Sequence, residues 1–350
     1  MYRNTYVEVN LDNLKYNLET IIDTTKEYEY HFGVVKADCY GCGLLGCLDT
    51  VINSGCNYLC VATLDEALEI RNVNKKIPIL CLGEIDKKYL DIAVKNNVTI
   101  TINSKDYLND IKIDRNLKVH IKINTGMNRL GLSNNEDVLY VYDHLKDRVE
   151  GIYTHIYEPS SSINYQRQID KFVECINGID LNKIKIIHTS ASEAMLNFKK
   201  LDFVNGCRIG ISMYGFYAPS LNLKSVFSLY SEVIQINNLK KGDTVGYDGT
   251  YKALGEEKIA VVSIGYADGI IRKNKGRFVY INNKKYEIVG NICMDMLFVK
   301  IDDDVNIYDK VILLKDNEHI NYVSDYLETI PYEIMCSIGK RVKRNYIKNV

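Results

Sequence analysis

The segment VVKADCYGCG, residues 34–43, places a lysine where an apolar run of strand type ends. Lys36 is followed at once by a loop in which Tyr40 stands among cysteines and glycines. Two kinds of chemistry fit these residue types. Cys39 and Cys42 have the C-x2-C spacing of a metal or redox motif. Alternatively, a lysine at the end of a buried strand can lose its proton by desolvation and attack a carbonyl group.

The other cysteines weigh against the metal interpretation. The chain has ten cysteines, and Cys47, Cys56 and Cys60 follow the first pair without forming a second pair of suitable spacing. A closed zinc site needs four ligands, usually from two such pairs. In a cytosolic chain of this length, reduced thiols in the core are the ordinary use of cysteine. We therefore expect buried or loop thiols and no metal site.

A repeating alternation of elements must position Lys36. Short apolar runs recur along the first two thirds of the chain, and most segments between them have helical periodicity. The runs are apolar nearly throughout, which is typical of parallel strands buried on both faces. Eight such units predict an α/β fold with an N-terminal (β/α)8 TIM barrel. The predicted strands lie at 30–37, 57–62, 77–83, 98–103, 117–124, 149–156, 184–190 and 202–211.

The pattern changes near residue 225. Beyond it the apolar residues alternate in short stretches that are broken by turn signals such as KKGD, YDGT and INNKK. We expect a barrel domain over residues 1–225 and a mostly β C-terminal domain over residues 226–350. Residues 1–10 are candidates for pairing with the C-terminal domain.

Polar side chains fall where the predicted barrel strands end. The loops that follow the strands of such a barrel converge at one mouth, where catalytic groups are found. Taken singly, each side chain has an ordinary structural explanation, but together they describe a site for a carbonyl compound that carries an anion. Pyridoxal phosphate is such a compound, with an aldehyde for the lysine and a phosphate for nearby glycines and a hydroxyl. The residues at the predicted mouth are Lys36, Arg129, His155, Ser192 and Arg208.

The balance of charge excludes several classes of partner. The chain has 350 residues with 44 basic and 45 acidic side chains, which gives a formal charge of -1. Such a balance leaves no electrostatic footprint for nucleic acid or for an anionic membrane. The N-terminal residues lack the continuous apolar stretch of a signal peptide or a membrane span. We expect a cytoplasmic protein with a small-molecule substrate.

Seven motifs together resemble one known family, the alanine racemases. They occur in the family's order along almost the whole chain and read VVKADCYGCG, TGMNRLGL, GIYTHIY, CRIGISMYG, VSIGYADG, NICMDM and PYEIMCSIGKRV. The resemblance implies racemisation of L- and D-alanine with pyridoxal 5'-phosphate, in a homodimer that shares its active sites between subunits. Lys36 would bind the cofactor covalently and act as one base. Tyr266 would be the second base, on the opposite face, contributed from the partner subunit.

The resemblance also assigns the remaining site residues. Arg208 would lie against the pyridine nitrogen, and His155 would link Arg208 to Tyr266. Arg129 and the backbone N–H of Met294 would lie near the substrate carboxylate, and Lys122 matches a lysine that is carbamylated in many members. The groups around the cofactor phosphate would be Tyr40, Ser192, Gly210, Ile211 and Tyr332.

Departures from the family pattern keep alternatives open. Cys42 stands where the family usually has histidine, and Asn124 and Asn128 stand where aspartate and glycine are common. Some phrases resemble a serine racemase branch, but that branch usually has a smaller polar residue at the position of Tyr332. The alternatives are a serine or broader-specificity racemase, a decarboxylase of the same fold and a cofactor-binding protein without catalysis.

Overall fold

A computed structural model of the chain describes residues 2–109 and 114–348. The chain divides into two compact units. One unit contains residues 15–39 and 47–223. The other contains the residues up to Leu14, the segment Tyr40–Gly46 and the residues from Lys224 onward. The lysine loop is thus divided between the units directly after Cys39.

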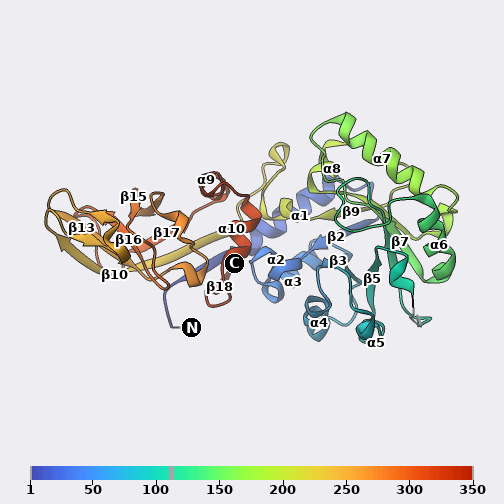
Figure 1. Ribbon diagram of the computed structural model, residues 1–350, viewed down its shortest axis with the longest axis horizontal. Helices are drawn as coiled ribbons and strands as arrows, with labels where there is room; N and C mark the ends of the chain where they lie inside the picture. Colours follow the sequence, from blue (N-terminus) through green and yellow to red (C-terminus); the bar gives the residue numbers. More distant parts are fainter. Residues whose placement is uncertain (1, 110–113, 349–350) are drawn as a thin grey trace. The chain divides into compact units, whose positions relative to one another are not determined.

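The first of these units is built on a closed barrel of parallel strands (Figure 1). Each strand pairs with the next along the chain, and the last pairs with the first. Nearly every strand residue is buried, as expected for strands covered on both faces. The predicted barrel is therefore confirmed, and each of the eight predicted runs overlaps one strand. The strands are β2 (Tyr30–Val34), β3 (Tyr58–Val61), β4 (Ile79–Cys81), β5 (Val98–Ile102), β6 (Val119–Lys122), β7 (Val149–Tyr153), β8 (Ile186–Ala191) and β9 (Gly206–Ile209).

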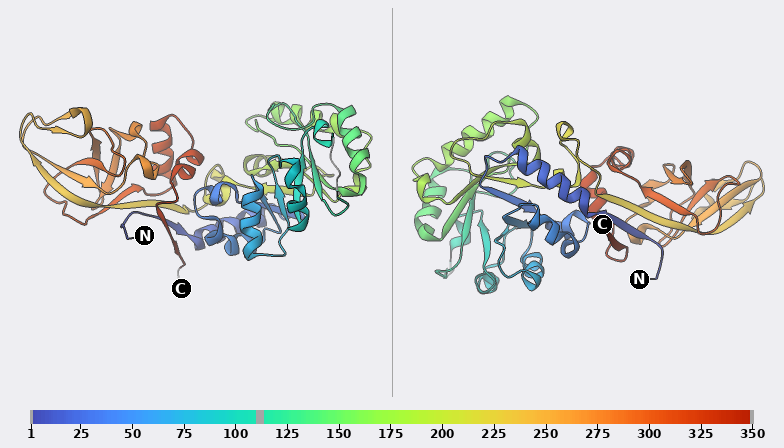
Figure 2. Two further views of the ribbon diagram at one scale, coloured as in Figure 1. Left: turned by 60° about the horizontal axis from the view of Figure 1, so that its bottom comes forward. Right: turned by 180° about the vertical axis from the view of Figure 1, so that it is seen from behind.

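Helices cover the outside of the barrel (Figure 2). Their starts follow local sequence signals: Thr63 forms a capping box with Glu66, and Asn134 and Ser161 cap the next two long helices. Apolar residues at helical spacing then turn one face of each helix towards the strands. The helices between and before the strands are α1 (Leu11–Thr24), α3 (Leu44–Asn53), α4 (Leu64–Val73), α5 (Leu90–Lys95), α6 (Asn135–Leu145), α7 (Ser162–Ile176) and α8 (Ser192–Asn197). The segment labelled α2 (Lys36–Tyr40) has left-handed backbone and forms a turn.

The second unit is built on an eight-stranded sheet in the order β13-β16-β15-β14-β17-β10-β1-β18. Strand β1 (Tyr6–Asn10) pairs antiparallel with β10 (Phe227–Leu239) and parallel with β18 (Lys343–Ile347). The mostly β character predicted for the C-terminal region is confirmed. The other elements are β11 (Thr244–Val245), β12 (Tyr251–Lys252), β13 (Glu257–Val262), β14 (Phe278–Ile281), β15 (Lys284–Val289), β16 (Leu297–Ile301), β17 (Lys310–Leu314), α9 (Asn317–Leu327) and α10 (Pro331–Ser337).

Three further observations concern the described residues of both units. Among residues 2–109 and 114–348, no helix combines the length and the apolar character that a membrane crossing requires. Eight of the ten cysteines are buried, Cys39 and Cys42 among them. Within the same described residues, histidine, cysteine and acidic side chains do not gather in threes as a metal site would need.

Candidate functional site

Lys36 stands two residues beyond the end of β2, at the start of a left-handed turn. The four residues that follow it, Ala37 to Tyr40, all have φ between 53° and 55°. Left-handed backbone costs roughly 1–2 kcal/mol for each residue that carries a Cβ, so four in succession store several kcal/mol of strain. The surrounding contacts must supply that energy. A strained segment beside a lysine is the kind of local departure that accompanies a functional site.

The carboxylate of Glu66 holds the start of this turn. Its Oε1 accepts a hydrogen bond of 2.6 Å from the backbone N–H of Ala37. Its Oε2 accepts from the N–H of Ala62 at 2.7 Å and of Thr63 at 3.3 Å. Glu66 therefore ties the end of β2 to the end of β3 and to the start of α4. Charge-assisted hydrogen bonds of this type are stronger than those between neutral groups.

Cys39 is part of the same support. Its backbone N–H donates to the carbonyl of Val35 at 3.0 Å, and its thiol lies 3.0 Å from the hydroxyl of Tyr214. The side chain is completely buried. This cysteine packs the turn against η5 (Ile211–Tyr214), a short helix that follows β9.

Basic side chains gather at the C-terminal end of the barrel. Burial, followed by the charges of Arg129, Arg208 and Lys36, lowers the pKa of Lys122 to about 8. Burial and the same arginines lower the pKa of His155 to about 3, so that this imidazole is neutral at physiological pH. A cavity of about 10 Å³, enough for roughly one water molecule, is lined by Lys122, Arg129 and His155 among others. The mouth is thus strongly electropositive and suited to anions.

Two asparagines shape the loop that carries Arg129. The Oδ1 of Asn124 accepts from the backbone N–H groups of Gly126 and Asn128 at 3.1 and 3.0 Å, and its Nδ2 donates to Asn128 Oδ1 at 3.0 Å. Asn128 has φ of 56°, in the left-handed region. Asparagine is among the few residues that adopt this conformation readily. The asparagine at 128 can therefore occupy a turn position for which glycine is the usual choice.

Arg208 projects from β9 and is almost completely buried. Its Nη1 donates to His188 Nδ1 at 2.6 Å and to the His188 carbonyl at 3.2 Å. Its Nη2 donates to the carbonyls of Thr154 and Thr189 at 2.7 and 3.0 Å. Among the residues that the structure describes, none accepts a hydrogen bond from its Nε. A fixed guanidinium with one remaining donor suits an acceptor nitrogen on a ligand.

A hydroxyl and two amides form a compact cradle after β8 and β9. The Oγ of Ser192 accepts from the backbone N–H groups of Gly210 and Ser212 at 3.1 and 3.4 Å and lies 2.9 Å from the Ser212 hydroxyl. Ile211 begins η5 directly beyond Gly210. N–H groups that converge in this way can bind phosphate oxygens. Ser212 belongs to this cradle although the sequence did not single it out.

Tyr266 and Met294 lie on two adjoining loops of the other unit. The N–H of Tyr266 donates to the carbonyl of Cys293 and that of Ala267 to the carbonyl of Met294, both at 3.0 Å. Tyr266 is 41% exposed and Met294 is 53% exposed. The pairing fixes these loops to each other while both side chains remain accessible. Tyr266 begins the one-turn helix η8 (Tyr266–Asp268).

A buried carboxylate supports these two loops. Asp268 accepts from the guanidinium of Arg3 at 2.5 and 3.1 Å, from Arg341 Nε at 2.8 Å and from the N–H of Gly265 at 3.0 Å. Arg341 also donates to Asp295 at 2.6 Å. The two loops are therefore held by one network of arginines and carboxylates.

Tyr40 and Tyr332 also meet within this unit. Their ring centroids are 5.9 Å apart with the planes tilted by 43°. Next to Tyr40, Gly41 has φ of 80°, and a Cβ there would overlap the carbonyl of Met335. Arg344 Nε donates to the Gly41 carbonyl at 3.0 Å. Glycine is required at this point of the lysine loop.

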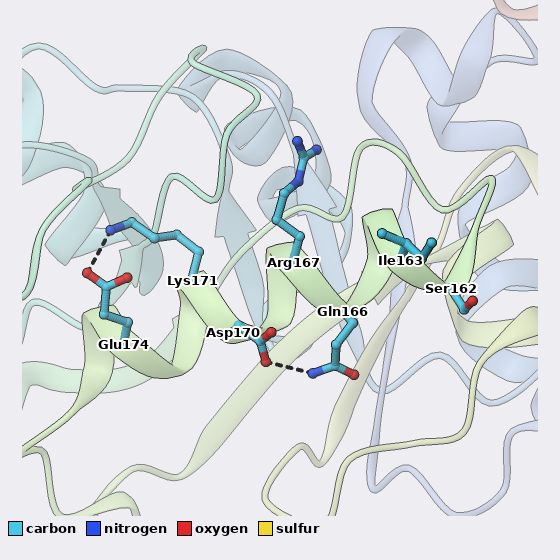
Figure 3. Close-up of a pocket in the computed structure, with 7 residues that line it drawn as sticks. All are labelled: Ser162, Ile163, Gln166, Arg167, Asp170, Lys171 and Glu174. Carbon is cyan, nitrogen blue, oxygen red and sulfur yellow. Dashed lines mark hydrogen bonds and ion pairs between the residues drawn. The ribbon is translucent and has the colours of Figure 1, made fainter.

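A larger hollow lies elsewhere on the surface. It has a volume of about 820 Å³, and its seven lining residues all belong to α7 (Figure 3). Gln166 donates to Asp170 at 2.7 Å and Lys171 to Glu174 at 2.9 Å, so these polar groups satisfy one another (Figure 3). Because a single helix lines it, this hollow offers no enclosure for a substrate.

The predicted residues thus form two groups, one in each unit. The barrel unit brings together the predicted basic groups and the serine cradle, and the sheet unit pairs Tyr266 with Met294 and Tyr40 with Tyr332. A direct link from His155 to Arg208 stays a prediction, since the hydrogen bonds of Arg208 described above go to other groups. The sequence did not identify Glu66 or Ser212. The capping-box spacing of Thr63 and Glu66 was a visible signal, but it does not disclose the bond to Ala37.

Comparisons with known proteins agree along the whole chain. The family model "Alanine racemase, N-terminal domain" matches residues 9–218, and "Alanine racemase, C-terminal domain" matches residues 226–346. The alanine racemase of Staphylococcus saprophyticus is 34% identical over 99% of this chain and 95% of its own length. Alanine racemase 1 of Bacillus subtilis is 33% identical over 99% and 94%. The crystal structure of alanine racemase from Bacillus anthracis with bound L-Ala-P has a TM-score of 0.92 at 32% identity and covers 100% of this chain and 96% of that one.

Proposed function

The chain belongs to the alanine racemase family, an isomerase family, and we propose that it interconverts L- and D-alanine with pyridoxal 5'-phosphate bound at the C-terminal end of the barrel. One observation carries the cofactor assignment: four basic side chains gather at the C-terminal end of the barrel, where Lys122 and Arg208 are buried, Lys36 is half-buried and Arg129 is exposed. Lys36, Arg129 and Arg208 are close enough to Lys122 to lower its pKa together. Such a site attracts a phosphate and a carboxylate at once.

The residues of the barrel fit each part of the cofactor. Lys36 offers an amine for the aldehyde, and the Ser192 cradle offers a hydroxyl and amides for the phosphate. Arg208 offers its remaining Nε donor to the pyridine nitrogen. Tyr40 and Tyr332 would add to the phosphate site. When bound, the cofactor provides an electron sink for the electron pair that remains when the Cα proton leaves.

Inversion at Cα requires one proton-transfer group on each face. We assign Lys36 to one face and Tyr266 to the other. Tyr266 is exposed and fixed through its backbone to the loop of Met294. The exposure of its side chain supports a role in a site completed by a second chain, so the assignment includes a homodimer in which Tyr266 of the partner subunit serves each site.

Arg129 and the backbone N–H of Met294 would hold the substrate carboxylate. Arg129 can pair with a carboxylate through two parallel hydrogen bonds. Lys122 is largely neutral above pH 8, and a neutral amine can react with carbon dioxide to give a carbamate. The resulting negative charge would hold Arg129 in place, because the two side chains line the same small cavity. His155 would link Arg208 to Tyr266.

The proposal also concerns substrate size and location. Tyr332 narrows the space for a substrate side chain, which favours a methyl group over longer groups. Discrimination against serine through one hydroxyl is at most about a hundredfold in such a pocket. We place the enzyme in the cytoplasm, where its amino-acid substrate is available.

A panel of L-amino acids tests reaction and substrate together. Purified chain supplied with pyridoxal phosphate should convert L-alanine to D-alanine and should introduce solvent deuterium at Cα. Lys36→Ala is the control that removes the covalent attachment point. Release of carbon dioxide without formation of D-alanine would instead identify a decarboxylase, and a faster reaction with L-serine would identify the serine racemase alternative.

A further inference from the structure

A row of polar side chains crosses the interior of the barrel below Arg208. His188 Nδ1 lies 2.6 Å from Arg208 Nη1, and His188 Nε2 lies 2.9 Å from His120 Nδ1. His120 Nε2 lies 3.7 Å from Glu150 Oε2. Glu150 is the second residue of β7, so the row runs from the N-terminal end of the barrel up to Arg208 on β9.

The proton positions along this row follow from the arginine. A guanidinium has only N–H donors, so His188 must accept at Nδ1 and must carry its proton on Nε2. That proton can only be directed to His120 Nδ1, which leaves the His120 proton on Nε2, facing Glu150. The donors of Arg208 and His188 therefore point the same way along two hydrogen bonds. The His120 N–H has no hydrogen-bond acceptor among the described residues and faces Glu150 Oε2 at 3.7 Å, so the last step is an electrostatic contact.

The surroundings keep the row dry. Both histidines are completely buried. The ring of His188 is stacked between Phe32 and Tyr153, with centroid distances of 4.6 Å on each side. In so apolar a space, charges interact over longer distances than in water.

Glu150 is well stabilised as an anion at the far end. Its Oε2 accepts from the hydroxyl of Tyr58 at 2.8 Å and of Thr99 at 3.3 Å. Its Oε1 lies 3.7 Å from Lys118 Nζ and 3.5 Å from Lys185 Nζ. Burial raises the pKa of Glu150, but the contact with His120, the Tyr58 hydroxyl and Lys118 outweigh it and hold the pKa at about 2. Burial lowers the pKa of both histidines, so neutral imidazoles separate two fixed charges.

We propose that Glu150 is a positioning residue for Arg208 and provides its counter-charge through His120 and His188. The assignment of Arg208 to the cofactor ring rests on the proposed function; the row of donors does not. A carboxylate placed directly on Arg208 would neutralise the guanidinium at the site. A carboxylate two imidazoles away stabilises the buried guanidinium of Arg208 and fixes its orientation. The positive charge of Arg208 then still faces the ligand.

Substitution of Glu150 by glutamine tests this role, because glutamine keeps the shape and an acceptor oxygen but removes the charge. Solid-state NMR of protein labelled with ¹⁵N-histidine reports which ring nitrogens carry protons. We expect both buried histidines to be neutral with the proton on Nε2, and we expect the signal of His188 Nδ1 to move in Glu150→Gln. In the cofactor-loaded enzyme, kcat should fall about tenfold, with KM changed less than about twofold. This is the loss expected when the charge-assisted hydrogen bond from Arg208 to His188 is weakened.

Two comparisons separate an effect transmitted through the row Glu150, His120 and His188 from a general structural effect. Asp137→Asn removes a carboxylate on α6 that pairs with Lys105, and it should leave the His188 signal and kcat unchanged. In a His120→Phe background, Glu150→Gln should have no further effect on kcat. If His120→Phe does not fold, the NMR spectrum of Glu150→Gln decides alone.

The inference is overturned if His188 carries its proton on Nδ1, or if its signal and kcat are the same in wild type and Glu150→Gln. It is also overturned if the effects of the two substitutions on kcat simply add. The NMR measurement requires no turnover. A chain with the predicted proton positions but without racemase activity would therefore contradict the proposed function, while the positioning role of Glu150 would still hold.

Discussion

Removal of the Glu66 side chain should release the strained turn beside Lys36. The carboxylate accepts three backbone N–H groups, and the bonds from Ala37 and Ala62 are only 2.6 and 2.7 Å long. In Glu66→Ala, the N–H of Ala37 loses the partner that holds the start of the left-handed turn. The turn should then relax towards ordinary backbone, which moves Lys36 away from its position at the end of β2.

The size of the effect can be worked from these contacts. Hydrogen bonds to a charged group contribute roughly 1.5–3 kcal/mol each when buried, and less where water can replace the acceptor. Two short, partly exposed bonds therefore account for about 2 kcal/mol in all. In Glu66→Ala, cofactor binding must restore the turn at a cost of about 2 kcal/mol. The affinity for pyridoxal phosphate should therefore fall about 30-fold. Glu66→Gln, which retains one acceptor oxygen, should lie between wild type and Glu66→Ala.

Cofactor titration and hydrogen exchange together provide the assay. Absorbance of the lysine-bound cofactor gives the dissociation constant, and amide exchange of the peptide that contains residues 35–40 reports the turn itself. Glu69→Gln, on the same helix, is the matched control and should resemble wild type. Unchanged affinity together with unchanged exchange protection in Glu66→Ala would refute the idea that this carboxylate holds the lysine loop.

Three further outcomes follow from the site. At constant carbon dioxide pressure, the carbamate on Lys122 should increase as the pH rises through about 8, because only the neutral amine reacts. ¹³C NMR with labelled carbon dioxide detects this carbamate. A spectrum without the carbamate signal from pH 7 to 9 would exclude the modification. Ser192→Ala removes the hydroxyl that the cradle would offer to the cofactor phosphate and should weaken cofactor binding about tenfold in equilibrium dialysis, since one hydrogen bond is lost; unchanged binding would place the phosphate elsewhere. Equal mixtures of Lys36→Ala and Tyr266→Phe chains should recover about a quarter of wild-type activity, because half of the dimers are mixed and each restores one site; mixed dimers without activity would contradict the shared site.

The barrel was predictable because its signal is local. Each strand is buried on both faces and therefore appears in the sequence as a continuous apolar run. Helix starts are marked locally as well, by the capping side chains of Thr63, Asn134 and Ser161. The residues at the strand ends could be identified for the same reason, since a polar group that terminates an apolar run stands out.

The supports of the site were not predictable in this way. The left-handed turn at Ala37 to Tyr40 has little local signature, because three of its four residues, alanine, cysteine and tyrosine, do not favour that conformation. Its partner Glu66 is 29 positions away in the sequence. His120 and His188 are ordinary strand residues until closure of the barrel brings their rings within 2.9 Å. Tertiary contacts of this kind are absent from any single window of sequence.

The resemblance to the family identified some site residues that local sequence patterns could not predict. Tyr266 and Met294 lie in short loops whose spacing implies no chemistry, and only the family motifs singled them out. The backbone bonds that join these loops and the Asp268 network beneath them emerged from the structure alone.

Solvent deuterium incorporation by Tyr266→Phe tests most directly whether two groups on opposite faces carry the proton transfer. With Lys36 intact, the variant should still exchange the Cα hydrogen of one alanine enantiomer with deuterium, while its conversion to the other enantiomer is lost. Full interconversion in both directions by Tyr266→Phe would contradict the assignment of the second face to Tyr266.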